Sequence, residues 1–214
     1  VGFLRLVDGD AIDVTNINRQ IHALTRTVGQ NKAEAMKVRL HDINPEAEVE
    51  AVAAFYCDEA AERFLGGGLD YVVDAMDMVT AKVSLAKACQ RRGLPLISSM
   101  GTAHKLDPTR LQVADLYDTS VCPLAKVMRR ALSARGVTRL KVVYSKEPPV
   151  KAADVAAEEA RPASIGGEGQ GALFSQRRER TLGSVSFVPS VAGLILAGEV
   201  VRDLVGGREK EEKA

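Results

Sequence analysis

Short apolar runs alternate along this chain with segments whose apolar residues recur at helical spacing. Residues 3–7 (Phe-Leu-Arg-Leu-Val) predict a buried strand, and residues 31–43 predict a helix that Asn44-Pro45 ends. Asp58 is expected to cap a short helix that ends at the glycines 66–68. The same patterns predict further strands at 49–56, 69–75, 94–98, 110–116 and 139–144, and further helices at 80–92, 123–135 and 190–205. Strands that alternate with helices indicate an α/β fold, with a Rossmann-like, doubly wound and mostly parallel sheet.

One long segment breaks the alternation. Residues 147–182 are rich in Pro, Gly, Ala and charge without sustained periodicity, so we expect a flexible insertion there. The 214 residues suffice for one good core, and we therefore expect residues 1–214 to form a single domain.

The nucleotide-binding form of this fold opens with a strand, a Gly-rich turn and a helix before the strand that carries the ribose-binding acid. Here that second strand starts at Phe3, and no G-x-G-x-x-G precedes it. The glycines of residues 166–171 neither follow a strand nor open a helix. We therefore expect an N-terminally truncated form that lacks the first unit and needs it for activity.

Composition narrows the class of protein. Apolar residues make up 46% of the chain and charged residues 27%, as in an ordinary globular protein, and the net charge of +1 argues against a globally basic nucleic-acid coat. No apolar stretch is long enough to span a bilayer, and the start has no signal-peptide pattern. Three cysteines without a C-x-x-C pair exclude a disulfide framework or a four-cysteine zinc site, so a cytoplasmic location is expected.

The candidate chemistry follows the first strand. Asp8 ends that strand, where open α/β sheets hold the ribose of a nucleotide. Arg19 and Lys32 can donate to phosphate oxygens, and Asp10 can hold a metal ion or a polar nucleotide group. This chemistry suits a nucleoside triphosphate attacked at its α-phosphate, and the alternative is a polar surface loop. The polar residues of this region are Asp8, Asp10, Asn16, Asn18, Arg19, Gln20 and Lys32.

These residues also carry a family resemblance. The pattern D-x-D-x-[IV]-x-x-[ST]-N-x-N-R-Q from Asp8, followed by G-x-x-K, resembles the adenylating domain of the ubiquitin-activating-enzyme superfamily (ThiF/MoeB/HesA). Residues 74–77 (Asp-Ala-Met-Asp), after the apolar run 69–73, are a second matching element. The resemblance implies ATP as substrate, Mg²⁺ near Asp10 and Asp77, and catalytic roles for Arg19, Lys32 and Asp77. It places Asp8 at the ribose and Asn16, Arg19, Gln20 and Lys32 around the phosphates, and it includes Asn18 among the nucleotide-binding residues.

One branch of the superfamily is the most similar. The segments 18–24, 107–109, 121–125, 142–147 and 183–189 resemble the tRNA threonylcarbamoyladenosine dehydratases. That branch implies ATP-dependent cyclisation of threonylcarbamoyladenosine in tRNA through an acyl-adenylate of the threonylcarbamoyl carboxylate. The superfamily further implies a homodimer and, as a possibility, sulfur-relay partner proteins. Two alternatives stay open: adenylation of the C-terminus of a ubiquitin-like sulfur-carrier protein, and a binding module without catalysis.

A basic cluster is the candidate tRNA surface. Arg129, Arg130 and Arg135 fall on one predicted helix, where they either contact tRNA phosphates or form a solvated face.

The remaining candidates are cysteines and histidines. Cys122, in an apolar Val-Cys-Pro-Leu stretch, is expected to be a buried hydrophobe rather than a nucleophile, and Cys57 and Cys89 are expected in the core. His22 and His104 each have two open interpretations, contact with the substrate or a structural role.

Overall fold

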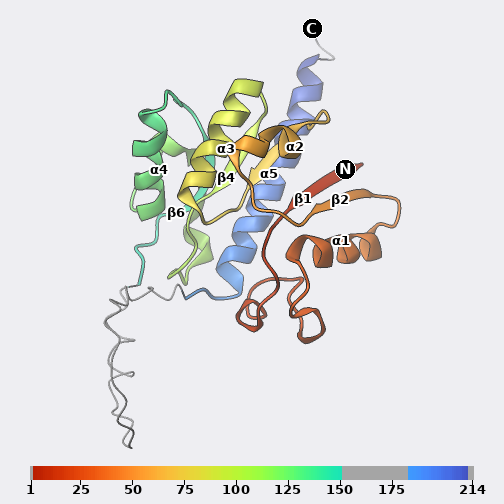
Figure 1. Ribbon diagram of the computed structural model, residues 1–214. Coiled ribbons are helices and arrows are strands. Elements are labelled where there is room, and N and C mark those ends of the chain that lie inside the picture. The colour runs from red at the N-terminus through yellow and green to blue at the C-terminus, as the bar shows by residue number, and fades with distance from the viewer. Residues whose placement is uncertain (1, 151–182, 212–214) are drawn as a thin grey trace, which may run out of the picture.

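Two hydrogen-bonded sheets form the centre of the computed structural model, which describes residues 2–150 and 183–211 (Figure 1). The smaller sheet pairs β1 with β2 in parallel, and the larger has the order β3-β4-β6-β5. In the larger sheet β3, β4 and β6 run parallel, and β5 runs antiparallel to β6. The strands are β1 Phe3–Val7, β2 Glu48–Val52, β3 Val72–Asp74, β4 Leu96–Ser99, β5 Leu111–Asp115 and β6 Lys141–Ser145.

Helices cover both faces of the larger sheet. Val142 and Tyr144 of β6 pack into a cluster with α3 and α4, whereas Val143, between them, packs against α5. Successive side chains of a strand point to opposite faces, so α3 and α4 lie on one face and α5 on the other. This arrangement confirms the predicted doubly wound α/β fold. The helices are α1 Lys32–Ile43, α2 Ala61–Leu65, α3 Val79–Arg92, α4 Pro123–Ser133 and α5 Phe187–Glu211.

The predicted elements exist, but several boundaries are wrong. The strand expected at 49–56 ends at Val52, and the one expected at 69–75 covers only Val72–Asp74. The last helix begins at Phe187, before Pro189, because proline is tolerated in the first turn, where no helical partner for its missing N–H exists. Asp58 is not a cap: it is the first residue of a 3₁₀ turn that precedes α2.

The structure describes only the first residues of the predicted insertion. The insertion expected at 147–182 lies, from residue 151 onward, outside the described residues. Among the helices of residues 2–150 and 183–211, none is long and apolar enough to cross a membrane.

Candidate functional site

The turn after β1 is built by one asparagine. Asn31 caps α1: its side-chain oxygen accepts from the backbone N–H of Ala33 at 2.9 Å and of Glu34 at 3.2 Å. Its side-chain nitrogen donates to the carbonyl oxygens of Asp8 at 2.9 Å and Asp10 at 3.1 Å. The amide thus joins the start of α1 to the end of β1. We predicted the helix but not this role, although Asn before an amphipathic run is a known cap pattern.

Lys32 and Asp10 meet at this turn. The Lys32 ammonium lies 2.7 Å from the Asp10 carboxylate, and the lysine side chain is 13% exposed against 53% for the aspartate. Lys32 is also the first residue of α1, whose N-terminal end favours an anion through its free N–H groups and its dipole. A phosphate that binds here would contact the Lys32 ammonium and could displace the exposed Asp10 carboxylate from it.

Arg19 and Asn18 form a second polar pair. One Arg19 nitrogen donates to the Thr15 carbonyl and to the Asn18 side-chain oxygen, both at 2.9 Å. The buried Asn16 uses its side-chain oxygen to accept from the Asp13 backbone, in a reciprocal cap that shapes the turn. Contact of these three predicted residues with phosphate stays a prediction.

The loops after several strands lie at one edge of the molecule. The Asn18 side chain donates to the Ser184 carbonyl, and the His104 backbone donates to the neighbouring Gly183 carbonyl, each at 2.9 Å. These bonds bring the loop after β1 and the loop after β4 to the same short segment. Because β3 runs parallel to β4, the residues that follow β3 leave the sheet at this edge too. This is the edge where open α/β sheets bind ligands.

Asp77 stands apart from the other predicted residues. It is exposed in the turn between β3 and α3. In the described residues no hydrogen bond or ion pair joins it to Asp8, Asp10, Arg19 or Lys32. No group of three or more His, Cys, Asp or Glu able to hold a metal occurs in the same part of the chain. A lone carboxylate still fits Mg²⁺ carried by nucleotide phosphates, which uses only one or two protein carboxylates.

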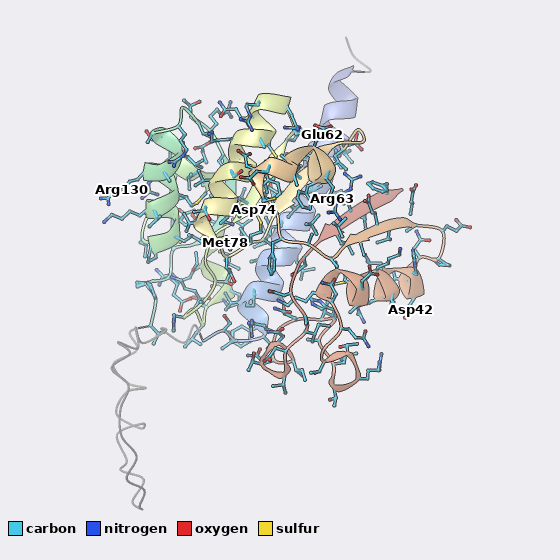
Figure 2. All side chains as sticks on the ribbon, viewed as in Figure 1. Asp42, Glu62, Arg63, Asp74, Met78 and Arg130 are labelled. Atoms are coloured by element: carbon cyan, nitrogen blue, oxygen red, sulfur yellow. The ribbon has the colours of Figure 1, made fainter. Side chains whose placement is uncertain are left out.

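Asp74, three residues before Asp77, belongs to a buried ion pair that the sequence analysis missed. The Lys82 ammonium is 2.9 Å from the Asp74 carboxylate, with side chains 0% and 1% exposed, and Figure 2 labels Asp74 beside α3. The Ser98 hydroxyl donates to the same carboxylate at 2.6 Å. A lysine between apolar residues on the buried side of a helix was the available sequence sign.

His22 is enclosed near the nucleotide motif. Burial lowers the pKa of its imidazole, and the charges of Asp8 and Lys32 act on it in opposite senses. Both ring nitrogens are buried, and within the described residues neither has a hydrogen-bond partner. Gln20, a predicted phosphate residue, has its side-chain oxygen in the same condition. His22 is therefore neutral at pH 7, and its two interpretations stay open.

A pH dependence follows from His22. Since its folded pKa lies below the unfolded value of about 6.5, the unfolded chain binds more protons below that pH. Stability should therefore fall as pH is lowered through about 6.5 toward 5. We expect His22→Gln to reduce the difference in melting temperature between the two ends of that range. An unchanged difference would show that His22 does not carry the loss.

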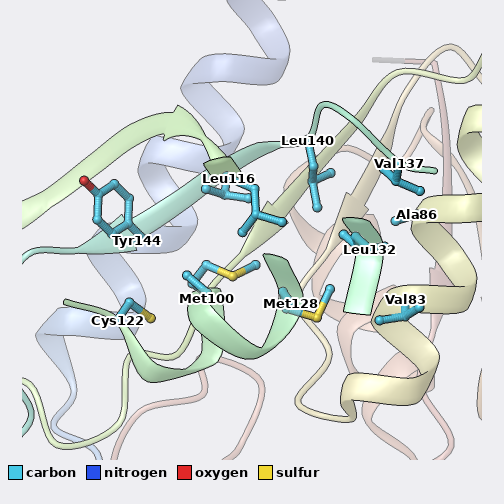
Figure 3. Close-up of a cluster of buried hydrophobic side chains, with 12 residues drawn as sticks. Val83, Ala86, Met100, Leu116, Cys122, Met128, Leu132, Val137, Leu140 and Tyr144 are labelled. Carbon is cyan, nitrogen blue, oxygen red and sulfur yellow. The ribbon is translucent and has the colours of Figure 1, made fainter. Parts of the chain in front are cut away.

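The cysteines are partly as expected. Cys122 is 3% exposed and packs among Met100, Tyr144 and their neighbours (Figure 3), which confirms that it is buried in an apolar cluster. Cys89 is buried, and burial raises the pKa of its thiol to about 11. Cys57 is exposed, because β2 ends before it, so its assignment to the core was wrong.

The three candidate tRNA residues differ in their surroundings. Arg130 extends into solvent from α4 (Figure 2). Arg129 is half-buried, and its guanidinium donates to the Thr119 carbonyl at 2.9 Å. Arg135, exposed, lies just past the end of α4 rather than on it as predicted, and it donates to the Ala131 carbonyl of that helix at 2.9 Å. Arg130 is thus the most available of the three for a phosphate.

The site and fold define a class of protein. A model of the ThiF family matches residues 1–214, so the chain belongs to the ThiF family. Within this family it is similar to the tRNA threonylcarbamoyladenosine dehydratase of Bacillus subtilis, with 47% identity over 206 residues, which cover 96% of this chain and 78% of that protein.

Two further relatives come from Escherichia coli. The tRNA threonylcarbamoyladenosine dehydratase is 41% identical over 134 residues, which cover 63% of this chain and 50% of that enzyme. The crystal structure of E. coli tRNA N6-threonylcarbamoyladenosine dehydratase in complex with ATP superposes with a TM-score of 0.81 and 28% identity, covering 98% of this chain and 78% of that chain.

Proposed function

We propose that this protein catalyses the ATP-dependent cyclisation of threonylcarbamoyladenosine in tRNA. The observation that carries the proposal is the 47% identity over nearly the whole chain to a dehydratase of that name. The superposition on a relative solved with ATP supports a nucleotide at the strand-end edge described above. ATP is thus the co-substrate, and the modified tRNA is the partner.

The chemistry begins with a poor electrophile. A free carboxylate cannot expel oxide, so the threonylcarbamoyl carboxylate attacks the α-phosphate of ATP and releases pyrophosphate. The acyl-adenylate then loses AMP when an atom of the same threonylcarbamoyl group closes a ring onto the carboxyl carbon. The net result is loss of water, with ATP converted to AMP and pyrophosphate. No protein nucleophile is required, which agrees with the burial of Cys122.

The residues at the edge supply electrostatic stabilisation. Asp8 would accept from the ribose hydroxyls, while Arg19 and Lys32 would donate to phosphate oxygens as negative charge moves onto them. Lys32 exchanges its exposed partner Asp10 for phosphate, and Asn16, Asn18 and Gln20 complete the polar wall. Mg²⁺, when bound, supplies charge neutralisation on the triphosphate, and Asp77, together with Asp10, the ion-pair partner of Lys32, would hold it.

ATP–pyrophosphate exchange separates the candidate functions. Exchange that depends on tRNA carrying threonylcarbamoyladenosine would support the proposal. Exchange that depends instead on the C-terminus of a ubiquitin-like sulfur carrier would favour that second function. The sequence contains no C-x-x-C pair that would support it. No exchange with either, in protein expressed from its complete gene, would leave a binding module.

The exposed cations of α4 are the proposed tRNA surface. Arg130→Ala should weaken tRNA binding and lower the slope of log affinity against log salt by roughly 0.7–0.9, because one phosphate contact is lost. Arg129→Ala should act mainly on stability, by about 1–3 kcal/mol, since its guanidinium bonds to carbonyl oxygens of the neighbouring turn. The measurements are tRNA affinity across salt and urea unfolding. A parental slope in Arg130→Ala would place the tRNA surface elsewhere.

We also propose that residues 1–214 belong to one adenylating domain whose sheet includes a further strand. Among the described residues, β1 and β3 are each paired on one edge alone, and Figure 1 shows the β1–β2 sheet beside the larger one. Val7 and Val73, on these two strands, are 36% and 49% exposed. A strand and Gly-rich turn between β1 and β3 would join the sheets.

Hydrogen exchange tests this domain proposal. Amides of β1 and β3 should exchange more slowly in the protein expressed from its complete gene than in residues 1–214 expressed alone. Equal exchange rates in the two proteins would contradict a shared strand.

The homodimer and the sulfur-relay partners remain proposals from the family, and the cytoplasm is the proposed location because the substrate is tRNA.

A further inference from the structure

In the buried Lys82–Asp74 ion pair, the lysine ammonium has a partner for each of its N–H groups. Lys82 lies in the first turns of α3, and its ammonium has three N–H groups. It lies 2.9 Å from the Asp74 carboxylate, and it donates to the Met76 carbonyl at 3.0 Å and to the Ser99 carbonyl at 2.9 Å. One ammonium therefore joins the ends of β3 and β4 to α3.

Asp74 completes the grip on the same turn. One of its carboxylate oxygens accepts from the Met76 backbone N–H at 3.0 Å, and the other accepts from the Ser98 hydroxyl at 2.6 Å. Met76 is thus held at both its N–H, by Asp74, and its carbonyl, by Lys82. The next residue in the chain is the exposed Asp77.

Stability alone does not account for this arrangement. Removing two charges from water is expensive, and a well-packed apolar pair of similar volume is often as stable as a buried ion pair or more so. An apolar pair, however, cannot fix both polar groups of a backbone turn. What the ion pair provides is a defined position for the turn.

We infer that Lys82 is a positioning residue, which holds the turn that presents Asp77 to the Mg²⁺ of bound Mg·ATP. The inference rests on the proposed function. Lys82 itself, fully enclosed, acts through Met76 and the adjoining backbone. Groups that orient a metal-binding carboxylate typically change metal affinity by about 10–100-fold when they are removed.

The test separates metal affinity from folding. In the paired variant Lys82→Met with Asp74→Asn, the charges leave together, so no charge is left buried alone. ATP affinity is measured by calorimetry, first in EDTA and then with Mg²⁺. We expect the affinity in EDTA to stay parental, while the gain that Mg²⁺ brings falls by about 10–100-fold.

A matched control is Arg92→Met, which breaks an exposed ion pair with Glu62 far from this turn and should leave the Mg²⁺ gain parental. Ser98→Ala removes one hydrogen bond to Asp74 and keeps the ion pair, so it should reduce the Mg²⁺ gain by a smaller factor than the paired variant does. It replaces the paired variant as the test if that variant does not fold. A parental gain in a folded paired variant, or in Ser98→Ala when the pair does not fold, would overturn the inference. Failure of the unmodified full-length protein to bind ATP would instead count against the proposed function.

Discussion

Arg19→Ala in the full-length protein should lower tRNA-dependent ATP–pyrophosphate exchange by about 10²–10³-fold, the usual effect of losing one preorganised donor to developing charge. Within the part of the chain that the structure describes, its guanidinium bonds only locally, to Thr15 and Asn18 in the loop after β1. The melting temperature should therefore stay close to the parental value. Asp77→Ala, in an exposed turn, should show the same separation between lost activity and kept stability.

Arg26→Ala is the matched control for this experiment. Arg26 is an exposed arginine a few residues further along the same loop, and it is not a member of the nucleotide motif. Its loss should leave exchange near the parental rate. If Arg19→Ala also exchanges at that rate, Arg19 does not belong to the active site.

Lys82→Met on its own should reduce the free energy of unfolding by about 3–5 kcal/mol, because the Asp74 carboxylate then remains buried without its countercharge. The Ser98 hydroxyl and the Met76 N–H are all that the described contacts leave to that carboxylate. Urea unfolding, followed by circular dichroism, measures the change.

Arg92→Met serves as the comparison for this prediction too. The Arg92–Glu62 pair has a shorter separation, 2.6 Å, but its side chains are 29% and 84% exposed, so its loss should change stability by about 0–1 kcal/mol. Equal effects of the two substitutions would mean that burial does not set the energetics of the Lys82–Asp74 pair.

The sequence predicted the alternation of strands and helices because apolar periodicity records which side of each element is buried. The prediction was wrong at Val52, because apolar residues continue beyond the hydrogen-bonded part of β2. It was also wrong at Phe187, because α5 begins before a proline that its first turn can accommodate. Periodicity does not report where backbone pairing stops.

The candidate site was predictable only in part. The motif identified Asp10 and Lys32, and the structure joins them in an ion pair. Asn31, Asp74 and Lys82 were missed as functional residues, because their roles depend on contacts that form only when strand ends and helices pack together. Arg129 and Arg130 are neighbours in sequence, yet only the fold shows that Arg129 bonds to a neighbouring turn whereas Arg130 extends into solvent.

The most direct test of the central claim is mass spectrometry of the product nucleoside. tRNA carrying threonylcarbamoyladenosine is incubated with the full-length protein and Mg·ATP, and the digested nucleosides and the released nucleotides are analysed together. We expect the modified nucleoside to lose one water, with one AMP and one pyrophosphate formed for each cyclised residue. An unchanged nucleoside, with AMP transferred instead to the C-terminus of a ubiquitin-like protein, would contradict the account.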